Sequence, residues 1–92
     1  MKSSYSEYVV IFKALSDETR IRIIKMLAEG ELCACHILEA FNITQPTLSY
    51  HMKILTECGL VNGRKDGAWM KYTLNEEKFN KIKDFYESIQ AL

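Results

Sequence analysis

The chain has 92 residues, 48% of them apolar and 26% charged, with a net charge of zero. The length predicts a single domain, 1–92, and the composition is typical of a soluble globular protein and too apolar for a disordered chain. No apolar run is long enough to cross a bilayer and no secretory leader begins the chain, so we expect a cytoplasmic protein without a membrane partner. Three cysteines, an odd number, argue against a disulfide scaffold and favour reduced thiols that are available for metal or redox chemistry.

The first part of the chain has the apolar spacing of helices. A first helix is expected over residues 5–15, where aromatic and aliphatic side chains recur near one face. Ser16 is expected to cap a second helix, which Gly30 ends. A third helix is expected over residues 31–41.

Residues 44–55, T-Q-P-T-L-S-Y-H-M-K-I-L, predict a helix with one apolar and one polar side. Thr44 is a suitable N-cap, and Pro46 fits the first turn because its missing N–H costs little there. At about 100° per residue, one arc holds only apolar side chains, and the opposite side carries hydroxyl, amide, phenol and ammonium groups. The apolar arc consists of Leu48, Met52 and Leu55.

Only residues 42 and 43 separate this helix from the one before it. Two helices joined by so short a turn, with the second one polar on its outer side, are typical of a helix-turn-helix, here at about 31–58. We therefore interpret residues 44–55 as a recognition helix for DNA.

From residue 60 the apolar period becomes two, which indicates strands. Asp66-Gly67 is a two-residue hairpin signal between strands expected at 60–65 and 68–74. A hairpin directly after a recognition helix is the wing of a winged helix-turn-helix, at about 60–74. Asn75 is expected to cap a last helix. The predicted fold class is mostly α with a β-hairpin wing, in the order α-α-α-α-β-β-α.

The first and last helices, at about 4–15 and 76–91, both carry aromatic-rich stripes that the compact winged core does not need. In one interpretation each packs on its own core. In the other, which we favour, they pack together and against a second chain as dimerisation helices. A two-fold homodimer would place two recognition helices roughly 34 Å apart, facing a palindromic double-stranded operator.

Positive charge gathers around the proposed DNA surface. Residues 42–75 contain four cationic and two anionic side chains, a net of 4 − 2 = +2, and the segments on either side are each net −1. Candidates for reading base edges, early on the recognition helix, are Gln45, Thr47, Ser49 and Tyr50. Candidates for phosphate contacts are Lys53, Arg64 and Lys65. His51 lies at the border of the apolar arc. Two roles are open for it, contact with a DNA phosphate or packing against the core.

Four segments follow one another in a familiar order. They are A-L-S-D-E-T-R-I-R-I at 14–23, E-L-C-A-C at 31–35, T-Q-P-T-L-S-Y-H-M-K-I-L at 44–55 and G-L-V-N-G-R-K-D-G-A-W-M-K-Y-T-L at 59–74. With them the chain resembles the ArsR/SmtB family of metal- and metalloid-responsive repressors, and E-L-C-x-C resembles the metalloid-binding motif of its arsenical-resistance members. The resemblance implies a homodimer that binds its operator without a cofactor. It also implies release when the inducer, As(III) or Sb(III), binds Cys33 and Cys35.

The thiols suit that inducer because thiolates are the soft ligands that a thiophilic ion selects. On a regular helix, side chains two residues apart point about 200° away from each other. Cys33 and Cys35 are therefore expected to bind one ion only if the start of the third helix unwinds. Since that helix supports the recognition helix, ion binding and DNA binding would be antagonistic.

A third ligand is left open among Cys58, a small cellular thiol and a solvent oxygen. Some relatives carry a further cysteine where this chain has Leu38. Cys58, just before Gly59, is more simply a small residue that fills space. A Cys33–His36 pair is a possible holder of Zn²⁺, but we expect His36 to be exposed without a ligand role.

Two alternatives keep the fold and change the signal. The cysteine pair could be an oxidisable dithiol that senses redox state or reactive sulfur, or the thiols could bind Cd²⁺, Pb²⁺ or Zn²⁺ with outside ligands. An enzyme is not expected. Ser49 and His51 are too close on one helix for a catalytic triad, and no nucleophile-elbow or phosphate-loop motif occurs.

Overall fold

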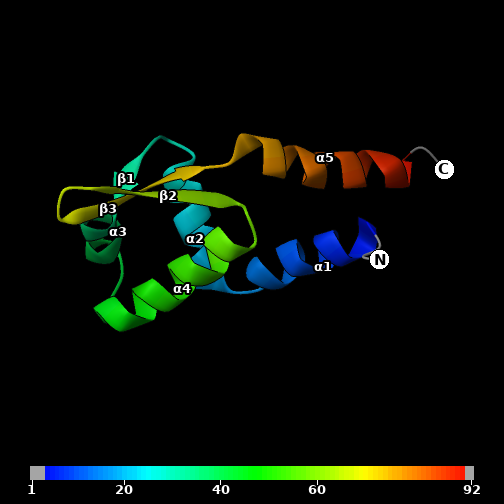
Figure 1. The fold of residues 1–92 in the computed structure, drawn as a ribbon. Coiled ribbons are helices and arrows are strands. Elements are labelled where there is room, and N and C mark those ends of the chain that lie inside the picture. Colours follow the sequence, from blue (N-terminus) through cyan, green and yellow to red (C-terminus); the bar gives the residue numbers. More distant parts are fainter. Residues whose placement is uncertain (1–3, 91–92) are drawn as a thin grey trace.

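The computed structural model describes residues 4–90. In that part of the chain it contains five helices and three strands, arranged as a winged helix-turn-helix (Figure 1). The elements are α1 (Ser4–Ala14), α2 (Glu18–Leu27), β1 (Leu32–Cys33), α3 (Ala34–Glu39), α4 (Gln45–Glu57), β2 (Val61–Asp66), β3 (Trp69–Leu74) and α5 (Glu76–Gln90). Residues 1–3 and 91–92 of the expected domain lie outside the described residues, as does residue 91 of the expected last helix. No described helix is long and apolar enough to cross a membrane.

Side-chain caps fix where three of the helices begin. The Thr44 hydroxyl accepts the backbone N–H of Thr47 at the start of α4, and the Asn75 carboxamide oxygen accepts that of Lys78 at the start of α5, both as predicted. The cap of α2 was expected at Ser16 and is Asp17 instead, whose Oδ1 lies 3.0 Å from the backbone nitrogen of Arg20. The Ser16 hydroxyl is engaged elsewhere, since it donates to the carbonyl of Lys13.

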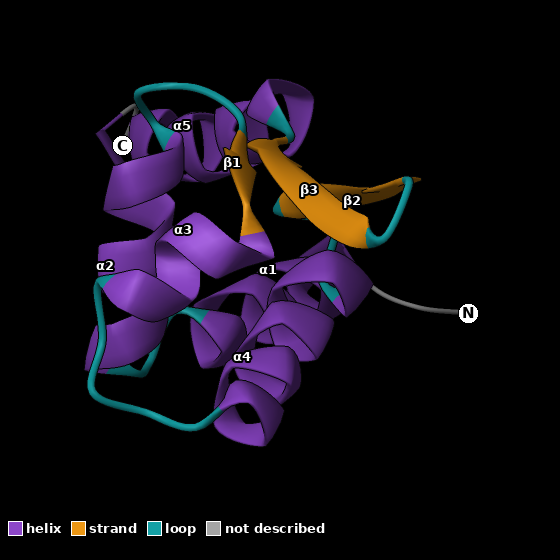
Figure 2. Ribbon diagram, turned by 90° about the vertical axis from the view of Figure 1, so that its left-hand side faces the viewer, coloured by secondary structure: helices purple, strands orange, loops and turns teal. Residues whose placement is uncertain are grey.

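The expected third helix over residues 31–41 is wrong at its start. Leu32 and Cys33 form β1, which pairs antiparallel with β3 in the register Leu32↔Tyr72 and Cys33↔Lys71. The physical reason is that the wing strand satisfies the backbone groups of these two residues, so the chain stays extended until α3 begins at Ala34. The wing is therefore the larger part of a three-stranded sheet in the order β1-β3-β2, which lies along one side of the helices (Figure 2).

The hairpin turn lies one residue later than predicted. Asp66 pairs with Trp69, so the two turn residues are Gly67 and Ala68. Gly67 has a φ of 64°, and no residue other than glycine has a positive φ in the described chain. A glycine alone at the first central position is the pattern of a II′ turn, whereas the predicted Asp-Gly turn needs positive φ at both positions.

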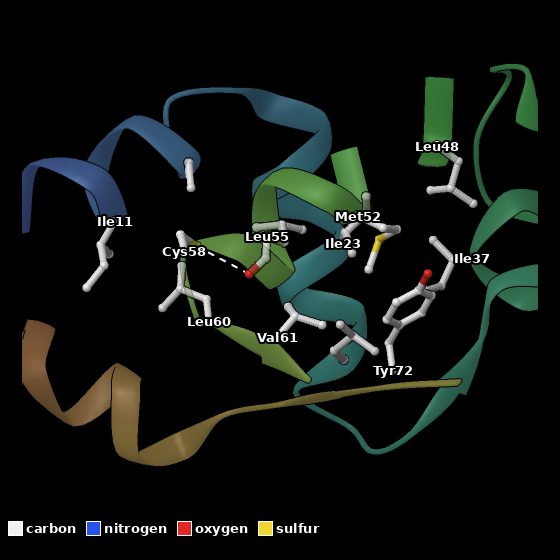
Figure 3. Packing of buried hydrophobic residues seen from close by; sticks show 12 residues of the cluster. Ile11, Ile23, Ile37, Leu48, Met52, Leu55, Cys58, Leu60, Val61 and Tyr72 are labelled. Atoms are coloured by element: carbon white, nitrogen blue, oxygen red, sulfur yellow. Dashed lines mark hydrogen bonds between the residues drawn. The ribbon is translucent and has the colours of Figure 1, made fainter. Parts of the chain in front are cut away.

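The core lies where α4 meets the other helices and the sheet (Figure 3). The predicted apolar arc of α4 is confirmed, because its three side chains are all buried. The largest fully buried side chains come from the first four helices, from β2 and from the residue before β2, and are Ile11, Ile23, Ile37, Leu55, Leu60 and Val61. This packing holds α4 by its apolar side and leaves its polar side facing outward.

Helices α1 and α5 lie side by side and extend away from the winged core (Figure 1). Phe85 of α5 contacts two rings of α1, with centroid distances of 4.9 Å to Tyr8 and 5.5 Å to Phe12. The Glu7 carboxylate joins the two helices through Lys78 at 2.6 Å and Lys81 at 3.1 Å. The two aromatic stripes therefore pack together, which was one half of the favoured interpretation.

Candidate nucleic-acid interface and thiol site

The outward side of α4 presents the side chains selected for base readout. All four candidates for base readout are exposed, and so is the lysine that was predicted to contact phosphate from this helix. The five residues are Gln45, Thr47, Ser49, Tyr50 and Lys53. Pro46 occupies the first turn, so it removes no helical hydrogen bond. The exposed groups combine donors, acceptors and one cation on a single helix surface, which is the chemistry that base edges and phosphates require.

His51 does not belong to that surface. Its side chain is buried, and its Nδ1 lies 3.1 Å from Nη1 of Arg20 on α2. A guanidinium only donates, so Nδ1 accepts this hydrogen bond. A buried ring held by Arg20 does not reach a phosphate, so of the two predicted roles for His51 its burial agrees with packing and not with DNA contact.

The cations of the wing differ in their surroundings. Arg64 forms a forked pair with Glu31, with its Nε 3.1 Å and its Nη2 2.9 Å from the two carboxylate oxygens. Lys71 lies 2.9 Å from Asp66, and this ammonium lowers the pKa of the Asp66 carboxyl. Lys65 is exposed and forms no ion pair within residues 4–90. Arg64 must therefore exchange Glu31 for a phosphate if it contacts DNA.

Cys33 and Cys35 lie at the junction of β1 and α3. Cys33 is the N-cap of α3 with extended backbone angles, φ −80° and ψ 156°, and Cys35 lies in the first turn. Their Cα atoms are 5.3 Å apart and their sulfurs form a disulfide, which differs from the expected reduced thiols. The expectation that the helix must unwind to bring them together is wrong, because Cys33 is not helical.

His36 is the third potential ligand at this junction. One donor atom from each of Cys33, Cys35 and His36 lies within 4.8 Å of the other two. Cys58 does not join this group. It is buried at the end of α4, where its thiol donates to the carbonyl of Leu55 (Figure 3), so its interpretation as a space-filling residue agrees with its position.

A cavity of about 330 Å³ lies between α3, α4 and the wing. Cys35 and Leu38 line it from α3, Leu48 and Ser49 from α4, and Trp69 from β3. Cys35 and residues of α4, among them Ser49 at the edge of its outward side, therefore border the same space.

Similarity to known proteins identifies the family of this chain. The family described as "Bacterial regulatory protein, arsR family" matches residues 17–63, just over half of the chain. The chain belongs to the ArsR family. Its helix-turn-helix lies inside the matched residues, and the match ends within the first strand of the wing.

Several known transcriptional regulators are similar over most of the chain. The arsenical resistance operon repressor of Staphylococcus xylosus is 51% identical over 74 residues, 80% of this chain and 71% of the relative. That of Staphylococcus aureus is 53% identical over 72 residues, 78% and 69% of the two chains. A cadmium resistance transcriptional regulatory protein, the CadC homolog of Staphylococcus aureus, is 34% identical over 82 residues, 88% and 68% of the two chains. These relatives are transcriptional regulators and not enzymes.

Solved structures of ArsR proteins share the fold. An ArsR-like transcriptional regulator from Rhodococcus sp. RHA1 is 31% identical with a TM-score of 0.84, covering 96% of this chain and 83% of its own. The ArsR family transcriptional regulator RHA00566 has a TM-score of 0.90 at 22% identity, covering 99% and 94% of the two chains. This chain is thus a winged-helix transcriptional regulator of the ArsR family, as its motifs indicated.

Two side-chain contacts of the site could not be predicted from the sequence. The ion pair between Glu31 and Arg64 joins residues 33 positions apart, and the hydrogen bond between Arg20 and His51 joins residues 31 apart. The residue types were visible as opposite charges or as a histidine near an apolar arc. No local spacing connects them, so only the folded chain shows the pairs.

Proposed function

We propose that this ArsR-family repressor binds a palindromic operator as a homodimer and is released when As(III) or Sb(III) binds the thiolates of Cys33 and Cys35. One observation carries the proposal: the cysteine pair lies where the strand that joins the wing meets the first helix of the helix-turn-helix. A thiophilic ion at that junction would bind residues of β1, which pairs with the wing strand β3, and of α3, which precedes the recognition helix. The arsenical resistance repressors among the relatives support this inducer class.

On the DNA side, α4 supplies base readout through its exposed polar residues, and Lys53, Lys65 and Arg64 supply phosphate contacts. Two recognition helices in one duplex require a dimer. The outer surface of the α1–α5 pair offers the interface, because four large side chains there are 48–72% exposed: Tyr5, Val9, Tyr86 and Ile89. Burial of such a surface is favourable at about 25 cal/mol per Å².

The coupling path is short. Cys33 pairs with Lys71 of β3, and Lys71 pairs in turn with Arg64 of β2, so the sensing cysteine and the wing cations lie in one row across the sheet. An ion bound to both thiolates replaces the Cys33–Cys35 bond with two longer sulfur–ion contacts, and we expect this change to displace the row at its β1 end. It also displaces the wall of the cavity that α4 shares. The predicted antagonism between ion and DNA is a coupling free energy, typically of about 1–3 kcal/mol.

The test is fluorescence anisotropy of the reduced protein on the DNA upstream of its own gene, with arsenite as titrant. We expect arsenite to release the DNA from the wild type but not from Cys33→Ser or Cys35→Ser. Cys58→Ser is the matched control, because this thiol is outside the donor group, and it should respond like the wild type. Arsenite release that survives both Cys33→Ser and Cys35→Ser would contradict the proposal.

The disulfide between Cys33 and Cys35 favours a second candidate, a dithiol redox or reactive-sulfur sensor. In this alternative, peroxide takes two electrons and two protons from the thiols, forms the disulfide and leaves water. The same anisotropy assay separates the candidates. Peroxide or persulfide would release the DNA from the reduced protein, and arsenite under strict reduction would not.

A further inference from the structure

We infer that the exposed indole of Trp69, the first residue of β3, packs against a deoxyribose ring of the DNA backbone when the wing meets the duplex. The inference deepens the proposed function, because it adds an apolar contact to the DNA surface and rests on DNA binding by this chain. Its starting point is that Trp69 is 56% exposed at the tip of the wing and borders a cavity that polar residues of the recognition helix also line.

Trp69 belongs to an apolar run at the hairpin tip. Ala68, Trp69 and Met70 follow one another, and all three are exposed. A single exposed apolar residue is ordinary, whereas three in succession on a surface are unfavourable in water unless they serve a contact. In Figure 1 the tip lies at the opposite end of the molecule from the α1–α5 pair, so a dimer formed through that pair leaves it uncovered.

The apolar run borders a groove between the wing and α4. Trp69 and Met70 line the cavity described above, and Gln45 and Ser49 line it from α4. A second cavity of about 330 Å³ shares Ser49 and Met70 with the first and extends to Lys53, so the two adjoin. Gln45, Ser49 and Lys53 are spaced by four residues and form one stripe of the helix. The groove therefore has the DNA-reading side of α4 as one wall and the tip of the wing as the other.

Gly63 of β2 maintains the wing side of this groove. A Cβ atom at this position would lie 3.0 Å from Cε1 of Tyr72 and 3.3 Å from Cε of Met70. Glycine inside a strand often marks a place where another group approaches closely. Any other residue at position 63 would push Tyr72 and Met70 aside, so glycine keeps these two side chains at the groove.

The charges around the tip favour a polyanion as the partner. Residues 64–71 contain three cationic side chains and one anionic side chain. Lys65 pairs with Met70 across the hairpin, so an ammonium group shares a face with part of the apolar run. Along a DNA strand each phosphate is followed by a sugar, and proteins contact both. A cation next to an apolar side chain matches one phosphate and the adjoining deoxyribose.

An indole suits such a contact. It offers a large flat apolar ring together with one N–H donor. Within residues 4–90 the Trp69 ring stacks on no other aromatic ring and its N–H has no acceptor, so both are available to a partner. The ring covers the sugar, and the N–H donates to an oxygen of the neighbouring phosphate.

This contact has a signature of its own. Apolar packing on a sugar displaces no counterion from DNA, so it adds affinity without steepening the salt dependence. The sugar is the same at every base pair, so the contact does not discriminate between sequences. The proposed phosphate contacts of Arg64 and Lys65 differ in the first respect, and the proposed base contacts of α4 differ in the second.

Trp69 is the only tryptophan of the chain, so tryptophan fluorescence reports on this position alone. The first experiment adds the DNA upstream of the gene, or an unrelated duplex of equal length, to the reduced protein and measures quenching by acrylamide. We expect both duplexes to lower the quenching by about twofold, because the contact covers one of the two faces of the ring. Quenching that is the same in the complex and in the free protein would overturn the inference.

The same measurement without DNA, over a range of protein concentrations, tests a second copy of the chain as the occupant. We expect no protection of Trp69 in this series. Protection that grows with protein concentration alone would assign the tip to a contact between copies and would overturn the inference.

DNA affinities measured over a range of salt concentrations supply the second readout. We expect Trp69→Ala to bind both duplexes about tenfold more weakly at every salt concentration, the scale of one well-packed interface aromatic. Trp69→Phe should recover most of this loss. Ile21→Ala is the matched control, since Ile21 is a 48% exposed apolar residue of α2 outside the groove, and it should bind like the wild type.

The pattern of loss in Trp69→Ala is decisive. A shallower salt slope would mean that a cation contact was lost, and a loss confined to the operator would mean that Trp69 reads bases. Either result would overturn the sugar contact. Urea unfolding followed by circular dichroism checks that the variant is folded, and the quenching experiment on the wild type does not depend on it.

Arsenite release separates this inference from the proposed function. If arsenite releases the DNA but acrylamide quenches Trp69 equally with and without DNA, the Trp69 contact fails and the proposed function stands. If DNA protects Trp69 but arsenite does not release the DNA, the Trp69 contact stands and the metalloid inducer fails.

Discussion

Arg20 of α2 donates a hydrogen bond to Nδ1 of His51, 3.1 Å away on the buried side of α4. The same guanidinium donates through Nε to the carbonyl of Ala14 at 2.6 Å and through Nη2 to that of Lys13 at 3.5 Å. One buried cation thus ties the end of α1 and the body of α4 to α2. We therefore expect Arg20 to contribute to the position of α4 from the side of that helix that faces the core.

Replacing Arg20 with leucine should lower the free energy of unfolding by about 1–3 kcal/mol, since buried acceptors on His51 and Ala14 lose their donor. Urea unfolding followed by circular dichroism measures this as a lower midpoint with an unchanged slope. Lys25→Leu, an exposed position on the same helix, should stay within about 0.5 kcal/mol of the wild type. Equal effects of the two variants would show that the buried pair does not hold α4.

The Glu7 carboxylate predicts an acid-sensitive contact between α1 and α5. Hydrogen bonds from Lys78 and then Lys81 lower the pKa of Glu7 from its ordinary 4.5. A lowered folded-state pKa adds stability above pH 4.5, and that stability is lost as the pH falls through the lower folded value. Glu7→Gln should therefore unfold more easily than the wild type at neutral pH, and the difference should vanish in acid.

The measurement is the thermal midpoint of both proteins as a function of pH. Glu29→Gln is the control, because this exposed carboxylate has no ion pair within the described residues. A Glu7→Gln difference that persists or grows on acidification would contradict the linkage.

Because Arg64 and Glu31 form an ion pair, we predict opposite effects on DNA affinity when each of them is replaced. Arg64→Gln removes a proposed phosphate contact, so it should weaken binding to all sequences alike and reduce the salt slope by about one unit. Glu31→Gln removes the nearer of the two carboxylates that pair with Arg64, leaving Asp66 at 3.7 Å, and should strengthen DNA binding. Anisotropy titrations over a range of salt concentrations measure both effects.

Lys65→Gln is the comparison for these variants, since it removes a wing cation that is unpaired within residues 4–90. It should reduce the slope as Arg64→Gln does. A loss of sequence discrimination in Arg64→Gln, at constant slope, would mean instead that the wing reads bases.

The proposed dimer surface gives the fourth prediction. Charges introduced by Val9→Glu together with Ile89→Glu should dissociate the dimer in sedimentation experiments. Operator affinity should then fall by at least about 100-fold, because the second half-site loses its tethered partner. Ile21→Glu is the control, an equally exposed apolar residue of α2 outside that surface. A monomeric wild type that binds its operator tightly would contradict the arrangement.

Local signals predicted much of the fold. Thr44, Pro46 and the apolar arc of α4 are close in sequence, and each acts through the nearest turn of helix, so spacing alone was sufficient. Asn75 as a cap is a signal of the same kind. The family motifs indicated the fold class through their order along the chain.

Three of the errors share one cause, which is a partner distant in sequence. Cys33 looked helical because its neighbours are helix formers, but its strand partner lies 38 positions away at Lys71. His51 looked like a residue at the edge of a DNA surface, but Arg20 holds it inside. The turn at Gly67 moved by one residue because the strand register, and not the Asp-Gly dipeptide, sets where the pairing ends.

All three potential donors of the thiol site lie within residues 33–36, while the DNA surface and the α1–α5 surface draw on other parts of the chain. If the proposed function holds, substitutions within these four positions should change which ion is bound and leave the proposed DNA surface and the proposed dimer surface intact. The same operator could then be placed under the control of a different thiophilic ion.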